Sequence, residues 1–155
     1  MHCTKSDTAS LKACIDSASA VGFEMVIISF GAGFNLESTN DTYIAEMRAI
    51  SDYAQGKGIE MGGYDLLAHT RSRGHDPDVE CIKCLTNSTT NSTTCAPDGS
   101  TCLASQGSDA IFSDIIGFVN KTNWGSVETD GPYEGESCAS TNHSHHVNLA
   151  DSVCE

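Results

Sequence analysis

Apolar residues along the chain follow a helical spacing in some segments and form short runs in others. Three segments carry them every three or four positions, the spacing of one helix face, and are predicted to be helices: 9–21, 42–56 and 108–119. Each is followed by a short segment that is predicted to be a strand: 23–30, 59–67 and 124–130. The first of these runs is β-branched and nearly unbroken, which is typical of a strand covered on both faces of a parallel sheet.

Helices that separate such strands indicate right-handed crossovers and therefore a parallel α/β fold. The links from helix to strand are very short, whereas the links from strand to helix are long and rich in polar residues. This asymmetry is typical of a TIM-type (β/α) barrel, whose working face lies at the carboxyl ends of the strands, although an open flavodoxin-like sheet shares it. Because a full barrel needs about 250 residues, we expect residues 1–155 to be a segment of one barrel domain, a partial barrel.

Residues 69–105 interrupt this pattern because they are polar and contain four cysteines. A stretch without an apolar core of its own is expected to be an inserted loop that disulfides hold in place. Cys81 and Cys84 are expected to pair within this insertion, most simply with Cys95 and Cys102. The tail from residue 134 is expected to be irregular, apart from a short helix near its end.

The cysteines and the glycosylation sequons indicate the compartment. Eight cysteines predict a disulfide framework, and they are Cys3, Cys14, Cys81, Cys84, Cys95, Cys102, Cys138 and Cys154. Five asparagines stand in Asn-X-Ser/Thr sequons and are candidate glycosylation sites: Asn40, Asn87, Asn91, Asn120 and Asn142. Together they predict a secreted extracellular glycoprotein. The first residues have neither the basic start nor the apolar core of a signal peptide, so we expect a segment of a longer chain.

Charge excludes several classes of partner. The chain has 21 acidic and 8 basic residues and a net charge of −13, which argues against nucleic acid and against anionic membrane surfaces. Its longest apolar stretch, 25–34, is far shorter than the roughly 20 residues of a membrane span. No cofactor or metal is expected. A metal site at His143, His145 and His146 is a minor alternative, and the cysteine spacing resembles a zinc site only loosely.

Acidic and aromatic residues follow the predicted strands. Tyr64 and Asp65 end the second strand, whereas Glu128, Asp130 and Tyr133 stand at the end of the third. Cleaving a glycosidic bond takes two carboxyl groups, and aromatic rings offer apolar faces to sugar C–H groups, so this pattern suits carbohydrate chemistry. The simpler alternative is that the aspartates only cap the loops that follow.

The stretch 58–133 resembles the α-galactosidase (melibiase) clan of retaining glycoside hydrolases. Gly58–Asp65 is similar to the family's strand Gly-Ile/Met-x-x-Gly-x-Tyr-x-Asp. Thr94–Ser100 resembles a loop with Thr-Cys and Pro-Gly-Ser, and Asn123–Asp130 resembles a Trp-Gly followed by a strand that ends Lys-x-Asp. The resemblance covers about half of the chain.

The resemblance implies that Asp130 is the nucleophile of a retaining mechanism. Tyr64, Asp65 and Tyr133 are expected to contact the sugar because they stand at the carboxyl ends of the predicted strands. Glu128 stands where the family has Lys, and as the second carboxylate on that strand face it is the other catalytic candidate. The family's acid/base lies on a later strand, so we expect the chain by itself not to hydrolyse glycosides. The alternative is a catalytically inactive structural glycoprotein that uses the barrel as a scaffold.

Overall fold

The computed structural model describes residues 1–66, 80–101, 106–129, 136–138 and 153–154, with side chains described in 1–66, 87–94 and 108–129. The chain forms two compact units. The first contains Met1–Asp65 and Ser113–Thr129, and the second contains Leu66–Phe112 and Asp130–Glu155. The boundary between the units falls within one helix.

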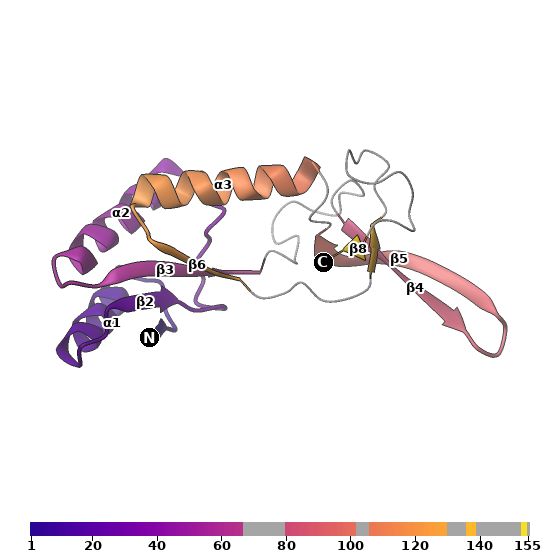
Figure 1. Ribbon diagram of the computed structural model, residues 1–155, viewed down its shortest axis with the longest axis horizontal. Helices are drawn as coiled ribbons and strands as arrows, with labels where there is room; N and C mark the ends of the chain where they lie inside the picture. Colours follow the sequence, from indigo (N-terminus) through magenta and orange to yellow (C-terminus); the bar gives the residue numbers. More distant parts are fainter. Residues whose placement is uncertain (67–79, 102–105, 130–135, 139–152, 155) are drawn as a thin grey trace. The chain divides into compact units, whose positions relative to one another are not determined.

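The first unit is built on a sheet of four parallel strands in the order β1-β2-β3-β6 (Figure 1). The strands are β1 (His2–Cys3), β2 (Met25–Ile28), β3 (Glu60–Asp65) and β6 (Ser126–Thr129). Each of these strands lies beside the one that precedes it in this unit, which is the order of consecutive β/α units. The predicted parallel α/β fold is confirmed, and the described strands form an open sheet.

Strand β1 is absent from the sequence prediction, which begins its first element at residue 9. It has only two residues and no apolar run. Backbone hydrogen bonds define it, because the Ile27 N–H donates to the Met1 carbonyl and the Ser29 N–H donates to the Cys3 carbonyl, each at 2.8 Å. A strand this short leaves no period for a sequence pattern to detect.

The three helices lie within a few residues of their predicted positions: α1 (Thr8–Ala20), α2 (Asp41–Gln55) and α3 (Gln106–Thr122). Asp7 caps α1 by accepting from the Ser10 N–H, and Asn40 caps α2 by accepting from Thr42 and Tyr43. Such caps satisfy backbone donors that have no partner inside the helix. None of the described helices is long and apolar enough to cross a membrane.

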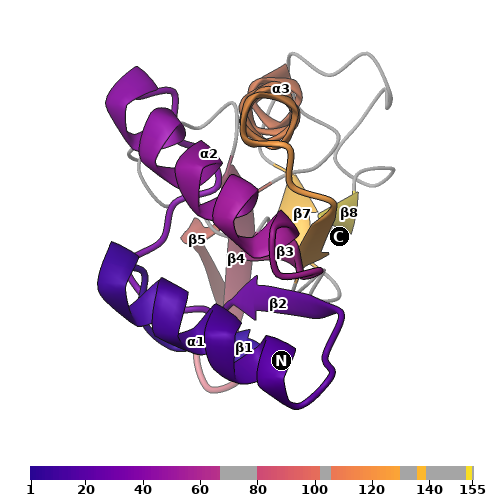
Figure 2. The same cartoon turned by 90° about the vertical axis from the view of Figure 1, so that its left-hand side faces the viewer.

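The helices cover one face of the parallel sheet (Figure 2). Val26 and Ile28 of β2 and Met61 of β3 are buried against them. An aromatic cluster completes this core, because Trp124 stacks on Phe34 with ring centroids 4.9 Å apart. On β2 the alternate residues are only half-buried. In the described residues β2 is therefore covered on one face, not on both as the sequence predicted.

A disulfide joins Cys3 of β1 to Cys14 of α1, with a Cα–Cα distance of 6.1 Å. The prediction that these two cysteines are oxidised is confirmed. The bond links the edge strand to the first helix on the covered side of the sheet. The side chains of the other six cysteines lie outside the described residues, so their oxidation stays a prediction.

The second unit is an antiparallel sheet in the order β5-β4-β7-β8. Its strands are β4 (Glu80–Asn87), β5 (Ser92–Thr101), β7 (Glu136–Cys138) and β8 (Val153–Cys154). The prediction of an irregular insertion is therefore wrong for residues 80–101, and the tail contains strands at 136–138 and 153–154 where an irregular course was predicted. The short helix predicted near the end of the tail lies outside the described residues. The Thr residues and the apolar Ile82 and Leu85 suit a pleated strand, whereas Pro97, Asp98 and Gly99 within β5 are typical of a loop.

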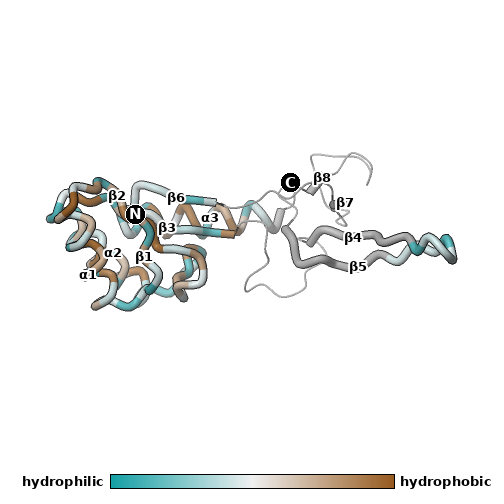
Figure 3. Tube along the Cα trace, turned by 90° about the horizontal axis from the view of Figure 1, so that it is seen from below, coloured by the Kyte–Doolittle hydropathy of each residue, from teal (hydrophilic) through white to brown (hydrophobic). Residues whose placement is uncertain are grey.

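The turn between β4 and β5 explains why the chain reverses there. The Asn87 carboxamide oxygen accepts from the Thr89 and Thr90 N–H groups, and Asn91 has a φ of 53°. Asparagine tolerates this left-handed conformation better than most residues. The turn is exposed and hydrophilic (Figure 3). In the register of the hairpin, Cys84 lies opposite Cys95.

Candidate functional site

Polar side chains gather on the face of the parallel sheet that the helices leave uncovered. The register pairs Tyr64 of β3 with Glu128 of β6. His2 of β1 belongs to the same face, because its row continues through Gly62 to Ser126, two residues before Glu128. Alternate residues of a strand share a face, so this surface, which we call the open face, also carries Glu60, Ser126 and the apolar side chains of Met25 and Ile27.

The open face is concave. The His2 Nε2 atom lies 3.2 Å from Glu128 Oε2, although β1 and β6 are the two edges of the sheet. Neighbouring strands are about 4.8 Å apart, so the two edges of a flat sheet would be about 14 Å apart. That is further than a His and a Glu side chain standing upright on the sheet can bridge. The contact therefore requires the sheet to curve toward the open face.

Gly62 supports this curvature from the middle of the sheet. A Cβ atom at Gly62 would lie 3.1 Å from Ile27 Cγ1 and 3.2 Å from Ser126 Cβ. Neighbouring strands thus crowd the position from both sides, as side chains do on the inside of a curved sheet. Glycine leaves the room that this close approach needs.

An aromatic pair borders the open face. Phe30 follows β2, and its ring centroid lies 5.8 Å from that of Tyr64 at an interplanar angle of 52°. Phe30 is 59% exposed, whereas Tyr64 is half-buried. An exposed ring beside a carboxylate and an imidazole offers both an apolar surface and hydrogen-bonding groups to one ligand.

Asp65 lies on the opposite face from Tyr64. It alternates with Gly63, where a Cβ atom would meet Phe34, Leu36 and Trp124 in the core, and it is fully buried. The structure therefore brings Tyr64 and Glu128 together and separates Asp65 from them. Asp65 therefore does not contribute to a sugar site on the open face.

Several of the other predicted site residues cannot be located. Asp130 and Tyr133 lie outside the described residues, as do Asn142 and the three histidines. His2 could not be predicted as a site residue, because a lone His in a polar segment has many ordinary roles. Among the described side chains, no three potential metal ligands come together.

Four sequons fall in the described part of the chain. Asn87 and Asn91, the turn sequons, are exposed in the β4–β5 turn. Asn40 uses its carboxamide oxygen as the cap of α2, and Asn120 is exposed on α3. The hydroxyl of Thr122, in the sequon of Asn120, donates to the Phe118 carbonyl at 2.8 Å. These positions leave glycosylation a prediction.

The fold and the open face define an α/β protein with parallel β/α units and a concave, polar surface between its edge strands. No protein-family model and no curated protein matches the chain. Its function must therefore be argued from the residues of the site.

Proposed function

We propose that the chain is part of a (β/α) barrel that binds carbohydrate on its open face. The close contact between His2 and Glu128 carries this proposal, because it requires a sheet that curves as a barrel wall does. Consecutive parallel strands with helices on the outer side are the repeating unit of such a barrel. The remaining strands would come from the rest of a longer chain or assembly.

The chemistry of the open face suits a sugar. The exposed ring of Phe30, with Tyr64 beside it, offers an apolar surface to sugar C–H groups. Glu128 accepts hydrogen bonds from hydroxyls, and the imidazole of His2 adds further hydrogen-bonding nitrogens. A ligand rich in hydroxyl groups matches this mixture better than an anion does, because the chain has a net charge of −13.

The resemblance to α-galactosidases extends the proposal to retaining hydrolysis of a glycoside. Asp130, directly after β6, would attack the sugar, and a second carboxyl group would act as acid and base. Glu128 is the candidate for that second group within this chain. Its contact with His2 holds the carboxylate at the sheet, so we expect the chain by itself to bind sugars without turning them over.

An inactive structural glycoprotein of the extracellular space is the second candidate. The Cys3–Cys14 disulfide and the exposed turn sequons favour an oxidising secretory route. In this case the open face would bind sugar or pack against the rest of the barrel, and Asp130 would have no chemical role. Both candidates share the proposal of secretion.

The proposal is tested by sugar binding to the 155-residue chain, with methyl α-D-galactoside as the probe in isothermal titration calorimetry. Phe30→Ala is expected to weaken binding about tenfold, since losing one aromatic contact costs about 1.4 kcal/mol. Ile116→Ala is the matched control, because Ile116 is 58% exposed on α3, away from both the open face and the amino ends of the strands. Equal losses in both variants, or no binding by the wild-type chain, would refute the proposed face.

Catalysis is tested with the same probe by following the release of galactose. We expect no turnover by this chain. Turnover that Asp130→Asn abolishes would instead show that the chain holds a complete catalytic pair. Turnover that persists in Asp130→Asn would contradict the assignment of the nucleophile.

A further inference from the structure

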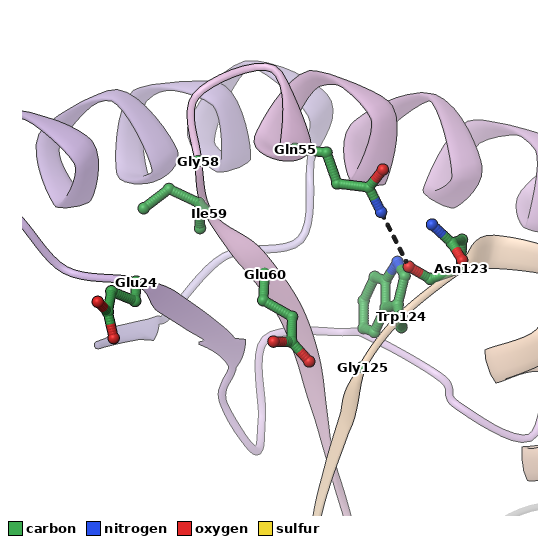
Figure 4. A pocket seen from close by; sticks show the side chains of 8 residues that line it. All are labelled: Glu24, Gln55, Gly58, Ile59, Glu60, Asn123, Trp124 and Gly125. Atoms are coloured by element: carbon green, nitrogen blue, oxygen red, sulfur yellow. Dashed lines mark hydrogen bonds between the residues drawn. The ribbon is translucent and has the colours of Figure 1, made fainter.

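A cavity of about 600 Å³ lies at the amino ends of β2, β3 and β6, at the opposite end of the strands from Tyr64 and Phe30 (Figure 4). We call it the amino-end cleft. Its volume falls in the range of small-molecule sites, about 300–1,000 Å³. The side chains that matter for its chemistry are Glu24, Glu60, Gln55 and Trp124.

Trp124 contributes a buried hydrogen-bond donor to the cleft. The residue is 4% exposed, and its indole Nε1 has no hydrogen-bond partner among the described residues. Its Cζ3 edge points at Gly63, well along β3. In Figure 4 the indole nitrogen lies on the side of Asn123 and Gln55, two of the residues that line the cleft. A buried N–H group without a partner is costly, and an acceptor supplied by a ligand removes that cost.

Two carboxylates supply acceptors. Glu60 places its carboxylate directly over Gly125, where a Cβ atom would collide with Oε1. The glycine thus leaves the space that this carboxylate occupies. Glu24 lines the cleft from the segment before β2.

The Gln55 amide also lines the cleft, on the side of α2 (Figure 4). Its nitrogen donates to the Asn123 carbonyl at 3.3 Å, and that carbonyl also accepts from the Ser51 hydroxyl at 3.0 Å. Asn123 is held in this way although its φ of 55° is unusual for a residue with a side chain. The segment that carries Trp124 is therefore fixed to α2, which keeps the indole in place at the cleft.

We propose that the amino-end cleft binds a neutral, polyhydroxylated ligand such as a monosaccharide or an inositol. Glu24 and Glu60 would repel an anion. An ammonium or guanidinium group would pair with the carboxylates but has no lone pair to accept from Trp124. A hydroxyl group both donates to a carboxylate and accepts from an indole N–H, so several hydroxyls on one small molecule satisfy both kinds of group.

The single tryptophan of the chain makes this proposal directly testable. A uniformly ¹⁵N-labelled 155-residue chain gives one indole N–H signal, which is followed while D-glucose or myo-inositol is added. The indole signal is expected to shift saturably and its proton to exchange more slowly with water. Sodium acetate and putrescine, an anion and a cation, are expected to give no saturable shift.

Two variants with the same change of charge distinguish the loss of a contact in the cleft from a general effect of the altered net charge on binding. Glu60→Gln is expected to weaken binding about tenfold, because it replaces a charged hydrogen-bond acceptor with a neutral one. Glu46→Gln, on the exposed side of α2, is expected to change nothing, and the remaining signals of each spectrum show that the variant is folded. A saturable response to putrescine, no response to either polyol, or equal losses in both variants would overturn the proposal.

The proposals for the amino-end cleft and for the open face can be refuted independently of each other. Phe30→Ala is expected to leave the indole titration unchanged, because Phe30 lies at the other end of β2. Loss of the indole response in that variant would contradict an independent site. A normal indole titration without any effect of Phe30→Ala on galactoside binding would instead refute only the proposed function.

Discussion

Gly63 offers the sharpest test of the core packing. It lies on the covered side of β3, and a Cβ atom there would be 2.6 Å from Phe34 Cε1 and 3.0 Å from both Leu36 Cδ1 and Trp124 Cζ3. Phe34 cannot easily withdraw, because it stacks on Trp124 with a centroid distance of 4.9 Å. Gly63→Ala therefore adds a methyl group where rings already fill the space.

The magnitude follows from two opposing effects. Overpacking a core costs about 1–3 kcal/mol, and three simultaneous contacts place this site at the upper end of that range. Replacing Gly by Ala also reduces the entropy of the unfolded chain, which returns about 0.4–1 kcal/mol. Gly63→Ala is therefore expected to lower the free energy of unfolding by about 2 kcal/mol.

Gly117 provides the matched control on α3. A Cβ atom at Gly117 would meet nothing within 4 Å. Since Ala is favoured over Gly inside a helix by about 1 kcal/mol, Gly117→Ala is expected to raise the free energy of unfolding by about 0.5–1 kcal/mol. The same substitution is thus expected to have opposite signs at the two positions.

Urea unfolding, followed by the fluorescence of Trp124, measures both effects in the first unit. Trp124 is buried there and is the single tryptophan of the chain. Unchanged denaturant slopes allow the midpoints to be converted into free energies. A Gly63→Ala protein as stable as the wild type, or a shift of the same sign in both variants, would refute the packing described for Phe34 and Trp124.

Three further predictions concern the disulfide, acid stability and glycosylation. Replacing Cys3 and Cys14 by Ser is expected to destabilise the first unit by about 3 kcal/mol in the chain-entropy model, and an unchanged urea midpoint would contradict this. The pKa of Asp7 is lowered, chiefly by the hydrogen bond from the Ser10 N–H. Its stabilising effect is therefore present above the pKa of the unfolded carboxyl and is lost as the pH falls through the lower folded value. Asp7→Asn should flatten this part of the acid-unfolding curve. In a eukaryotic secretory host, mass spectrometry is expected to find glycans at the turn sequons, and unmodified asparagines would remove a main argument for secretion.

The sequence predicted the helices and longer parallel strands well because their apolar residues are regularly spaced. Leu11, Ile15 and Ala18 of α1 are all buried, as the helical spacing requires. The hairpin was missed because β4 has only two large apolar residues and β5 has none, and because β5 contains Pro97, Asp98 and Gly99, so the segment resembled a loop. Strand β1 was missed because two residues are too few to show an alternation of apolar and polar positions.

The candidate site could be predicted only in part. Because side chains alternate along a strand, Tyr64 and Asp65 must lie on opposite faces of the sheet. The sequence does not show which of the two faces the helices cover. The structure settles that Asp65 is buried among core residues and that Tyr64 shares a face with Glu128. No local pattern could place His2 beside Glu128, because that contact depends on the curvature of the whole sheet.

The insertion of the β4–β5 hairpin between β3 and α3 affects how the chain folds. The paired residues Ile27 and Gly62 of β2 and β3 are 35 positions apart, whereas Gly62 and Ser126 of β3 and β6 are 64 apart. Closing the longer loop costs only about 0.5 kcal/mol more, because closure entropy grows with the logarithm of length. Folding rates are more sensitive to distant pairings. We therefore expect the first three strands to assemble early and β6 to be the last of the parallel strands to gain protection from hydrogen exchange during refolding.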